Sequence, residues 1–482
     1  MMHRLFVAAG LLGVLGWSSA LAVAEEAAVA DPRPVVSTEA NTAPTALDRY
    51  VAAEDPAYEW KLRSSRKEIG STVYVLEMVS QKWRASDDVN RTEWRHWLTI
   101  AKPNGVTADT AMLFITGGAN GGELPESTSR EALLLAGATR SVIAELKMVP
   151  NQPLVFHGDG TPRKEDDLIG YSWDQFLETG DEQWPAQLPM TKSAVRAMDT
   201  IQEFLASDEG GNFEVEKFVV TGASKRGWTT WLTGAVDRRV VAIAPIVIDV
   251  LNVNVSMNHH FAAYGFWAPA IGDYVHHQIP HRRFEPRYRE LLQIVDPFAY
   301  RDRLTMPKCI INASGDQFFL PDSSQFYFKE LPGEKHLCYV PNSEHSLRGT
   351  NAIDTLAAFH YTVVHGIERP RLKWEFPDAN TIRVSASDSP TKVTLWKATN
   401  GESRDFRTDT IGRAYESEPL TPDAEGVYTA TVPTPEAGWA AFFVQFEFDV
   451  DAPTPLRIST PVRVVPEGLP HADTPAPVIE AE

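Results

Sequence analysis

The chain has little cysteine: only Cys309 and Cys338 occur among its 482 residues. Two cysteines cannot form a disulfide framework, and without metal-spaced partners they do not support a structural zinc site. They lie in two segments that we expect to form neighbouring strands. We therefore expect two buried, reduced thiols, and we expect the protein to use neither a metal nor another cofactor.

A histidine-rich segment does not change that expectation. Metal ligands on one helical face need an i, i+4 spacing with carboxylate support. Only His277 and His281 have this spacing, and Pro280 interrupts a helix between them. We expect these side chains to be polar groups near a substrate rather than metal ligands. The segment from 250 to 303 holds five histidines: His259, His260, His276, His277 and His281.

Long apolar runs are also lacking, apart from one that extends from Leu5 to Trp17. A membrane-spanning helix needs about 20 apolar residues, and this run is shorter. It follows Arg4 and ends in the small residues of "SSALAVA", as an export signal does before its cleavage site. We expect a signal peptide over 1–24 and a flexible leader over 25–48. A periplasmic or secreted protein without a stable membrane anchor is predicted.

Positive charge is in deficit, because 45 basic residues stand against 64 acidic ones, for a net charge of −19. A negative field of this size repels the phosphates of nucleic acids and of anionic lipids. The charge therefore argues against nucleic-acid binding and membrane-surface binding, and a small-molecule or carbohydrate-ester substrate fits it better.

Short apolar runs alternate with helical patterns through the first three quarters of the chain. "TAMLFITGG", "EKFVVTG" and "PKCIINASG" are runs closed by turn residues, as expected of buried parallel strands. "PMTKSAVRAMDTIQEFLAS" has apolar residues at helical spacing. This alternation predicts an α/β fold over 49–369, with a parallel sheet covered on both faces. The long insertion at about 250–303 is predicted to form a lid over a site.

After Pro370 the helical periodicity disappears. Segments such as "TKVTLWKAT" and "WAAFFVQFEFDV" alternate as strands do and are divided by turn residues. We expect an immunoglobulin-like or fibronectin-type β-sandwich over 370–466. A Pro-rich and acidic tail, also predicted to be flexible, follows over 467–482.

The stretch "FVVTGASKRGWTTW" places Ser224 between a strand and a helix. A nucleophilic serine on such an elbow usually reads G-x-S-x-G. Gly222 fits that pattern, but Arg226 occupies the second small position and the glycine is displaced to Gly227. We expect a G-x-S-x-x-G elbow in which the side chain of Arg226 points outward. A serine that serves only as a turn residue is the alternative.

Two further strands end in residues that fit the same chemistry. "CIINASGD" carries Asp316 after a glycine turn, and "HLCYVPNSEH" carries His345. The chain order Ser, Asp, His is that of an α/β-hydrolase triad, in which the imidazole activates the hydroxyl and the carboxylate orients the imidazole. Asp249, at another strand end, and Asp322 are rival acids. Because Asp316 directly follows a glycine turn, it is the favoured acid.

An acyl-transfer site also needs N–H donors for the oxyanion. The backbone N–H of Lys225 starts a helix directly after the serine, where the helix dipole favours negative charge. The second donor is expected from the loop "ITGGANGGE", as the N–H of Gly118 or Ala119.

Tryptophans are concentrated in the segments expected near the serine. We predict Trp184, Trp228 and Trp267 as candidate walls of a substrate pocket, although core packing is the usual role of a tryptophan. Arg226 is a further candidate, because Lys225 and Arg226 beside the serine could hold a substrate carboxylate. Salt bridges to acidic side chains are the alternative role for both cations.

Long strings of the chain resemble the PhoPQ-activated pathogenicity-related family, from about residue 45 to beyond residue 450. The clearest are "VTGASKRGWTTWLTGAVDRRVVAIAPIVIDVLN" and "INASGDQFFLPDSSQFYFKELPGEKHLCYVPNSEHSL". The resemblance implies an exported α/β-hydrolase-like protein with a C-terminal β-sandwich. It also implies that Ser224, Asp316 and His345 occupy the family's triad positions. It brings no substrate, since the family is named after a regulatory context.

These observations predict an exported serine hydrolase that cleaves carboxylic esters, with carbohydrate esters among the candidate substrates. An amidase or peptidase would use the same triad. A non-catalytic binding or signalling protein built on a hydrolase fold is the alternative from another class, and reactivity of Ser224 discriminates it from the enzymes.

Overall fold

The computed structural model describes residues 43–68 and 70–474. The predicted signal peptide over 1–24 lies outside these residues, as do residues 25–42 of the predicted leader. The described part opens with helix α1 (Ala46–Ala52), whose first turn is closed by a capping box between Thr45 and Asp48. Helical structure therefore begins before the predicted end of the leader.

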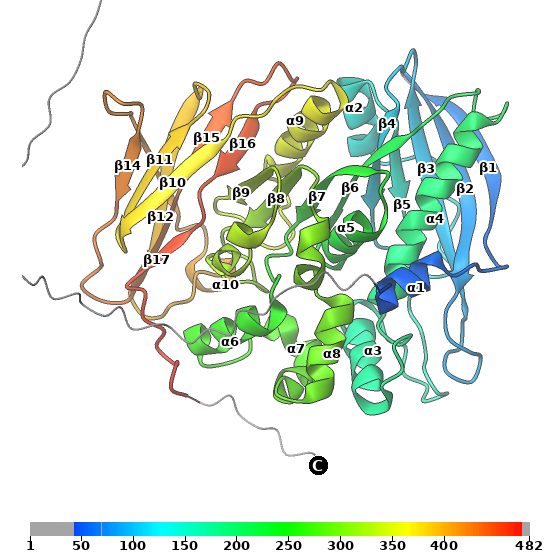
Figure 1. The fold of residues 1–482 in the computed structure, drawn as a ribbon, viewed down its shortest axis with the longest axis horizontal. Helices are drawn as coiled ribbons and strands as arrows, with labels where there is room; N and C mark the ends of the chain where they lie inside the picture. The colour runs from blue at the N-terminus through cyan, green and yellow to red at the C-terminus, as the bar shows by residue number, and fades with distance from the viewer. Residues whose placement is uncertain (1–42, 69, 475–482) are drawn as a thin grey trace, which may run out of the picture. The chain divides into compact units, whose positions relative to one another are not determined.

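A mixed sheet forms the centre of the molecule (Figure 1). Its first strands run in the order β1-β2-β3-β5-β4-β6-β7-β8-β9. The pairs from β1 to β5 are antiparallel, whereas β5-β4-β6-β7-β8-β9 are parallel. The strands are β1 (Glu59–Glu68), β2 (Ser71–Lys82), β3 (Glu93–Pro103), β4 (Thr110–Ile115), β5 (Ile143–Leu146), β6 (Lys217–Ala223), β7 (Val240–Ile246), β8 (Lys308–Ala313) and β9 (Lys335–Val340).

Helices cover both faces of this sheet, which confirms the predicted α/β fold. Alternate side chains of a strand point to opposite faces, and along β4 Leu113 joins one core cluster while Met112 joins the other. Helices α4 and α5 pack on the face of Leu113, and α2 and α9 pack on the face of Met112. Their bounds are α2 (Arg130–Thr139), α4 (Gln187–Ala206), α5 (Lys225–Val236) and α9 (Ala352–Val364).

The segment between β7 and β8 is the predicted insertion, and it is mainly helical. With α3 (Glu165–Thr179), its helices lie at one end of the sheet (Figure 1). The insertion contains α6 (Val253–Tyr264), η1 (Pro269–Ile271), α7 (Gly272–His276), η2 (Ile279–Arg282), α8 (Pro286–Val295) and η3 (Pro297–Arg303). The loop between β8 and β9 adds η4 (Ser323–Phe326) and η5 (Phe328–Glu330).

The residues after 370 form antiparallel strands in two layers. One layer has the order β16-β15-β12-β13 with β17 on β15, and the other has the order β10-β11-β14. Tyr428 and Phe446 meet between the layers, with ring centroids 5.3 Å apart. The elements are β10 (Leu372–Asp378), β11 (Thr381–Ala386), β12 (Lys392–Asn400), α10 (Thr408–Ile411), β13 (Glu416–Pro419), β14 (Tyr428–Thr431), β15 (Trp439–Phe448), β16 (Leu456–Ser459) and β17 (Arg463–Val465).

One of these layers continues the α/β sheet. Ser459 of β16 pairs with Leu337 of β9 in antiparallel register, so that the described strands of both regions form a single 14-stranded sheet. An unpaired β9 would leave a row of exposed N–H and C=O groups, and β16 covers that edge. The sheet therefore runs across the boundary that the change of sequence pattern predicts at residue 370.

The start of the predicted flexible tail is packed against the insertion. The N–H of His471 donates to the carbonyl oxygen of Ala262 at 2.9 Å, and Leu469 packs against Ala263 and its neighbours. The predicted tail over 467–482 is therefore attached to α6 at least through His471, and residues 475–482 lie outside the described residues.

Both cysteines are buried free thiols. Cys309 of β8 lies opposite His336, and Cys338 of β9 lies opposite Ile311, so that the two thiols are offset along neighbouring strands. This agrees with the expectation of reduced thiols. Within the described ranges, no helix combines the length and the apolar character needed to cross a bilayer.

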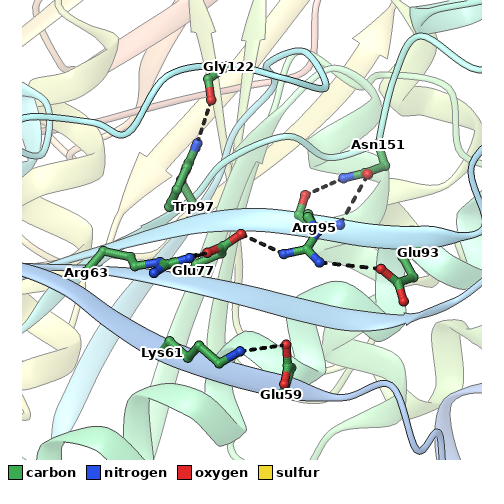
Figure 2. Close-up of polar contacts among 9 residues, drawn as sticks. All are labelled: Glu59, Lys61, Arg63, Glu77, Glu93, Arg95, Trp97, Gly122 and Asn151. Carbon is green, nitrogen blue, oxygen red and sulfur yellow. Dashed lines mark hydrogen bonds and ion pairs between the residues drawn. The ribbon is translucent and has the colours of Figure 1, made fainter.

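Charged side chains line the outer antiparallel strands β1 to β3 (Figure 2). Glu77 accepts hydrogen bonds from Arg63 and Arg95, at 2.7 Å from the Nε of Arg63 and 2.7 Å from the Nη1 of Arg95. Exposed pairs of this kind contribute about 0–1 kcal/mol each. Strand β1 is the edge of the sheet, and its charged side chains, Lys61 and Arg63 among them, discourage edge-to-edge pairing with other chains.

Candidate active site

Ser224 sits in a strained turn between β6 and α5. Its φ of +58° and ψ of −127° place it in a region that L-residues rarely adopt, at a conformational cost of about 1–3 kcal/mol. The surroundings hold it there: its N–H donates to the carbonyl oxygen of Ile246 at 2.8 Å, and its own carbonyl accepts from the N–H of Trp228 at 2.9 Å. The geometry is that of a nucleophile elbow.

The displaced glycine of the motif now has a physical explanation. A Cβ on Gly222 would lie 2.7 Å from the carbonyl oxygen of Arg226, and a Cβ on Gly227 would lie 2.9 Å from that of Ile246. Both positions must therefore be glycine, because backbone atoms cannot yield as a side chain can. The two residues between Ser224 and Gly227 carry side chains. That of Arg226 does not point outward as expected: it is largely buried, and its guanidinium extends over Gly117, where a Cβ would lie 2.7 Å from its Nη2.

Lys225 and Arg226 pair with carboxylates at the start of α3. The carboxylate of Glu165 lies 2.8 Å from the Nζ of Lys225. It also accepts hydrogen bonds from the Nη2 and Nη1 of Arg226, at 2.7 and 2.8 Å. Asp166 lies 3.3 Å from Lys225. Burial raises the pKa of Glu165, but the Arg226 hydrogen bonds and the Lys225 charge outweigh it and hold that pKa at about 2. Arg226 is not among the residues that line the cavity at Ser224, because its guanidinium is paired with Glu165.

Asp316 and His345 lie together after β8 and β9. The Nδ1 of His345 is 2.8 Å from Oδ2 and 2.9 Å from Oδ1 of Asp316. The same carboxylate accepts from the N–H of Phe318 at 2.8 Å, which fixes its orientation. The Nε2 of His345 is buried and has no hydrogen-bond partner among the described residues, and no hydrogen bond joins it to the described Ser224 hydroxyl. Such catalytic bonds often tighten only with substrate bound.

The rival acids have other partners. Asp249 accepts hydrogen bonds from the hydroxyls of Tyr327 and Tyr339, both at 2.6 Å. Burial raises the pKa of Asp249 to about 7, although the two tyrosine hydrogen bonds oppose that rise. Asp322 is 3.0 Å from His259 and 2.6 Å from the Nη2 of Arg404. Of the three candidates, only Asp316 contacts His345.

A cavity of about 60 Å³ opens at Ser224. Lys225 and Asp166 are the charged residues of its lining, and residues of the insertion form much of the rest. Phe318 lies between the cavity and His345: it lines the cavity, and its ring centroid is 4.3 Å from that of His345. The apolar lining comes from Trp173, Trp228, Ile248, Val250, Val253, Met257, Ile271, Tyr274, Ile279, Pro280, Tyr288, Phe318 and Phe319. The insertion thus supplies much of the lining, and its role as a lid stays a prediction.

Of the three predicted tryptophans, one reaches this cavity. Trp228 lines it, and its indole N–H donates to the carbonyl oxygen of Val295 at 2.5 Å. Trp184 is instead buried beside Trp83, and Trp267 packs against Phe261 outside the lining. The structure therefore does not bring Trp184 and Trp267 to this cavity, because packing in the folded chain, not position in the sequence, decides which tryptophan faces it.

The loop after β4, which contains Gly117 beside the guanidinium of Arg226, is fixed by side-chain hydrogen bonds. Gln152 donates to the carbonyl oxygen of Gly118 at 3.1 Å, and the indole of Trp97 donates to that of Gly122 at 3.3 Å (Figure 2). Gly118 has a φ of +143°, and a Cβ there would lie 3.1 Å from Met148. Neither Gly118 nor Ala119 lines the cavity as the structure has it, so the second oxyanion donor stays a prediction.

The histidines of the insertion have structural partners. The Nε2 of His277 is 2.8 Å from Asp167, and the Nε2 of His260 accepts from the N–H of Ala268 at 3.1 Å. Within residues 43–68 and 70–474, no three His, Cys, Asp or Glu side chains are grouped as a metal site would require.

The sheet order, the strained elbow and the His–Asp pair define an α/β-hydrolase-like protein. Residues 47–407 match the PhoPQ-activated pathogenicity-related protein family, and the chain belongs to that family. A Dictyostelium discoideum relative, autocrine proliferation repressor protein A, is 39% identical over 455 residues, covering 88% of this chain and 91% of the relative.

Solved structures with a similar fold are more distant. Acetyl xylan esterase 1 from a Thermoanaerobacterium species is 15% identical, with a TM-score of 0.45 over 66% of this chain and 91% of that one. A glucuronoyl esterase from Solibacter usitatus is also 15% identical, with a TM-score of 0.38 over 65% of this chain and 90% of that one.

Proposed function

We propose that the protein is a serine hydrolase that cleaves carboxylic esters through an acyl-enzyme on Ser224. The observation that carries this proposal is the strained Ser224 elbow, which opens into a cavity beside the Asp316–His345 pair. A serine used only to turn the chain would not need the strain, the glycines at 222 and 227, and a buried imidazole nitrogen left without a partner.

The steps follow from the positions of these groups. The Ser224 hydroxyl attacks the acyl carbon while His345 Nε2 accepts its proton, and Asp316 stabilises the imidazolium through Nδ1. The N–H of Lys225, with that of Gly118 or Ala119, holds the oxyanion. His345 then returns the proton to the leaving alcohol. Water next attacks the acyl-enzyme, His345 Nε2 accepts its proton, and that proton returns to the Ser224 oxygen as the acid leaves.

The cavity favours a short, uncharged acyl group. It measures about 60 Å³ and its lining is mostly apolar, which leaves little room for a long chain. A uronate or other anionic acyl group would need a free cation, whereas Lys225 and Arg226 are already neutralised by Glu165 and Asp166. The alcohol part, which extends out of the cavity, is the part for which a carbohydrate is a candidate.

Two further parts of the proposal rest on the sequence and on the strand order, and two alternatives stand beside it. Export to the periplasm or the outside is proposed from the apolar run Leu5–Trp17 and its small-residue end. An immunoglobulin-like arrangement is proposed for the two antiparallel layers after residue 370. An amide substrate would use the same groups. The name of the Dictyostelium relative makes a non-catalytic signalling role the competing proposal from another class.

Labelling with a fluorophosphonate probe tests the proposal. We expect one adduct by intact mass on the mature protein and none on Ser224→Ala, after which acetyl, butyryl and octanoyl esters of one alcohol would show a preference for the shorter acyl groups. Absence of an adduct on folded protein, repeated with a small sulfonyl fluoride that a closed lid would admit, would reject a reactive serine and favour the signalling role.

A further inference from the structure

A second and larger cavity lies where the C-terminal strands meet the α/β sheet. It measures about 1080 Å³, and its walls come from η4, η5 and the start of β9 on one side and from β10, β16 and β17 on the other. Among the described residues it shares no lining residue with the cavity at Ser224. Small-molecule sites run to about 1,000 Å³, so a ligand of several rings fits this volume.

Its charge is opposite to that of the whole chain. The described lining contains six basic side chains and three acidic ones, although the protein carries a net charge of −19. The basic residues are Lys329, Lys335, Arg371, Lys373, Arg404 and Arg463, and the acidic residues are Asp322, Glu334 and Glu467. A locally positive cavity in an acidic protein attracts anions selectively, because the surrounding field repels them elsewhere.

The three carboxylates are already neutralised by neighbours. Asp322 pairs with Arg404 and His259, and Glu467 pairs with Arg463. Glu334 pairs with Arg369, at 2.9 Å, and with His336, at 2.8 Å. In contrast, four lining cations have no carboxylate partner within the described ranges: Lys329, Lys335, Arg371 and Lys373. The uncompensated charge of the cavity is therefore positive and spread over several points.

Arg404 supplies a second, independent indication of a ligand. Its side chain is only 3% exposed, and its Nη2 donates to Asp322 at 2.6 Å. Its Nε and Nη1 are buried and have no hydrogen-bond partner among the described residues. A buried donor left without a partner costs about 1–3 kcal/mol, and more for a charged group. Arg404 is one of the residues that line the cavity, so a small shift of its side chain toward an anionic oxygen bound there would satisfy these donors.

Aromatic rings form the apolar part of the lining. Phe328 and Trp374 are in contact, with ring centroids 5.7 Å apart, and Trp374 is only half-buried. The ammonium of Lys335 lies 5.1 Å from the ring centre of Phe328, and the guanidinium of Arg463 lies 4.7 Å from that of Phe376. Flat apolar faces beside cations suit a ligand in which rings and negative charges alternate.

We propose that this cavity binds an acidic oligosaccharide, in which carboxylates meet the three lysines and the one arginine that have no carboxylate partner, and a sugar ring stacks on Trp374. A single inorganic anion would leave most of the volume and the aromatic faces unused. The hydroxyl oxygens of a neutral sugar could accept from Arg404, but they would leave the charge of the four cations without a carboxylate partner uncompensated. The site does not depend on the reactivity of Ser224, since the two cavities share no described lining residue.

Calorimetric titration with galacturonate tetrasaccharide tests the proposal. The full-length mature Ser224→Ala protein is used, so that ester chemistry cannot interfere, and maltotetraose and inorganic sulfate serve as neutral and simple-anion ligands. We expect the uronate tetrasaccharide to bind at least tenfold more tightly than either, and to bind more weakly as salt is raised. Arg371, directly before β10, and Lys373, on β10, are both exposed, and the pair Arg371→Ala, Lys373→Ala should weaken binding at least tenfold without loss of folding.

A matched control separates the cavity from general charge. Lys67 is an exposed strand lysine outside the cavity, and Lys67→Ala should leave binding unchanged. Trp374→Ala should also weaken the uronate tetrasaccharide, because the stacking face is lost. Equal binding of maltotetraose would overturn the acidic class. Sulfate affinity equal to that of the uronate would reduce the cavity to a simple anion site, and absent binding or insensitivity to the cavity variants would reject the site altogether.

Discussion

Gln317 holds the backbone of His345: its Oε1 accepts a hydrogen bond from the His345 N–H at 2.9 Å. On its other side, its Nε2 donates to Thr408 and Asp409, both at 3.1 Å. Thr408 also donates its N–H to the carbonyl oxygen of Gly315 at 3.0 Å. The segment between β12 and β13 thus braces the loops that carry both Asp316 and His345, and the C-terminal region is a structural support of the candidate active site.

Gln317 is therefore a positioning residue, and Gln317→Ala should slow the proposed chemistry. Loss of one hydrogen bond costs about 0.5–1.5 kcal/mol, which corresponds to a roughly 2–13-fold slower fluorophosphonate reaction. Gln317→Glu keeps the acceptor for His345 and should recover part of the rate. Gln293→Ala, at an exposed position of α8, is the control and should react as the unmodified protein does. An unchanged rate in Gln317→Ala would show that the brace is dispensable.

The choice of acid can be tested by replacing one carboxylate at a time. Asp316→Asn should lower activity on the order of 10³–10⁴-fold, because the imidazole loses its orienting carboxylate and its stable tautomer. Asp249→Asn is the matched control, since Asp249 is a buried strand-end aspartate that contacts tyrosines instead of His345. It should keep the labelling rate within a few-fold. The reverse order of effects would identify Asp249 as the acid.

Asp249 should also make stability depend on pH. Its pKa is raised to about 7 in the folded protein, against 3.8 for an unperturbed aspartate. Between these values the folded state holds a proton that the unfolded state has released, so the free energy of unfolding falls as pH rises from about 4 to 7. Asp249→Asn removes this contribution. The melting temperature of the variant minus that of the unmodified protein should therefore increase from pH 4 to pH 8, and a difference constant with pH would contradict the raised pKa.

Gly222→Ala should disable the elbow. The new Cβ would lie 2.7 Å from the carbonyl oxygen of Arg226, so the first turn of α5 and Ser224 must shift. We expect loss of fluorophosphonate labelling together with a lower melting temperature. Gly137→Ala in α2 is the matched control, because nothing lies within 4 Å of the added Cβ. It should leave labelling intact and raise stability by about 0.4–1 kcal/mol. Full labelling of Gly222→Ala would show that the elbow does not need this glycine.

Glu165→Gln should destabilise the N-terminal turn of α5, which contains Lys225 and Arg226. The substitution leaves Arg226 without its carboxylate, while Lys225 keeps only the longer contact to Asp166. Breaking a fully buried pair costs about 3–5 kcal/mol, but Glu165 is 37% exposed and solvent screening reduces that to about 1–2 kcal/mol. The loss should be present at neutral pH and shrink as pH falls through the range from 4.5 toward 2, where Glu165 itself becomes protonated. Urea unfolding at pH 7 and pH 3 measures both values.

Much of the candidate site could be predicted because its chemistry lies in local patterns. A short apolar run followed by a glycine turn is enough to place Ser224 or Asp316 at the end of a strand. Parallel strands bring such ends to one edge of a sheet. Gln317 directly follows Asp316 in the sequence, yet nothing near it indicates its role, since its partners Thr408 and Asp409 are 91 and 92 residues away.

The sequence by itself determined the alternation of strands and helices, the glycines of the elbow and the order of the three candidate catalytic residues, because each depends on neighbours within a few positions. Only the tertiary structure decided that Arg226 pairs with Glu165, that Trp228 rather than Trp184 faces the cavity, and that β16 pairs with β9. These contacts join segments far apart along the chain. Their partners are selected by packing, burial and charge in three dimensions, which no local pattern records.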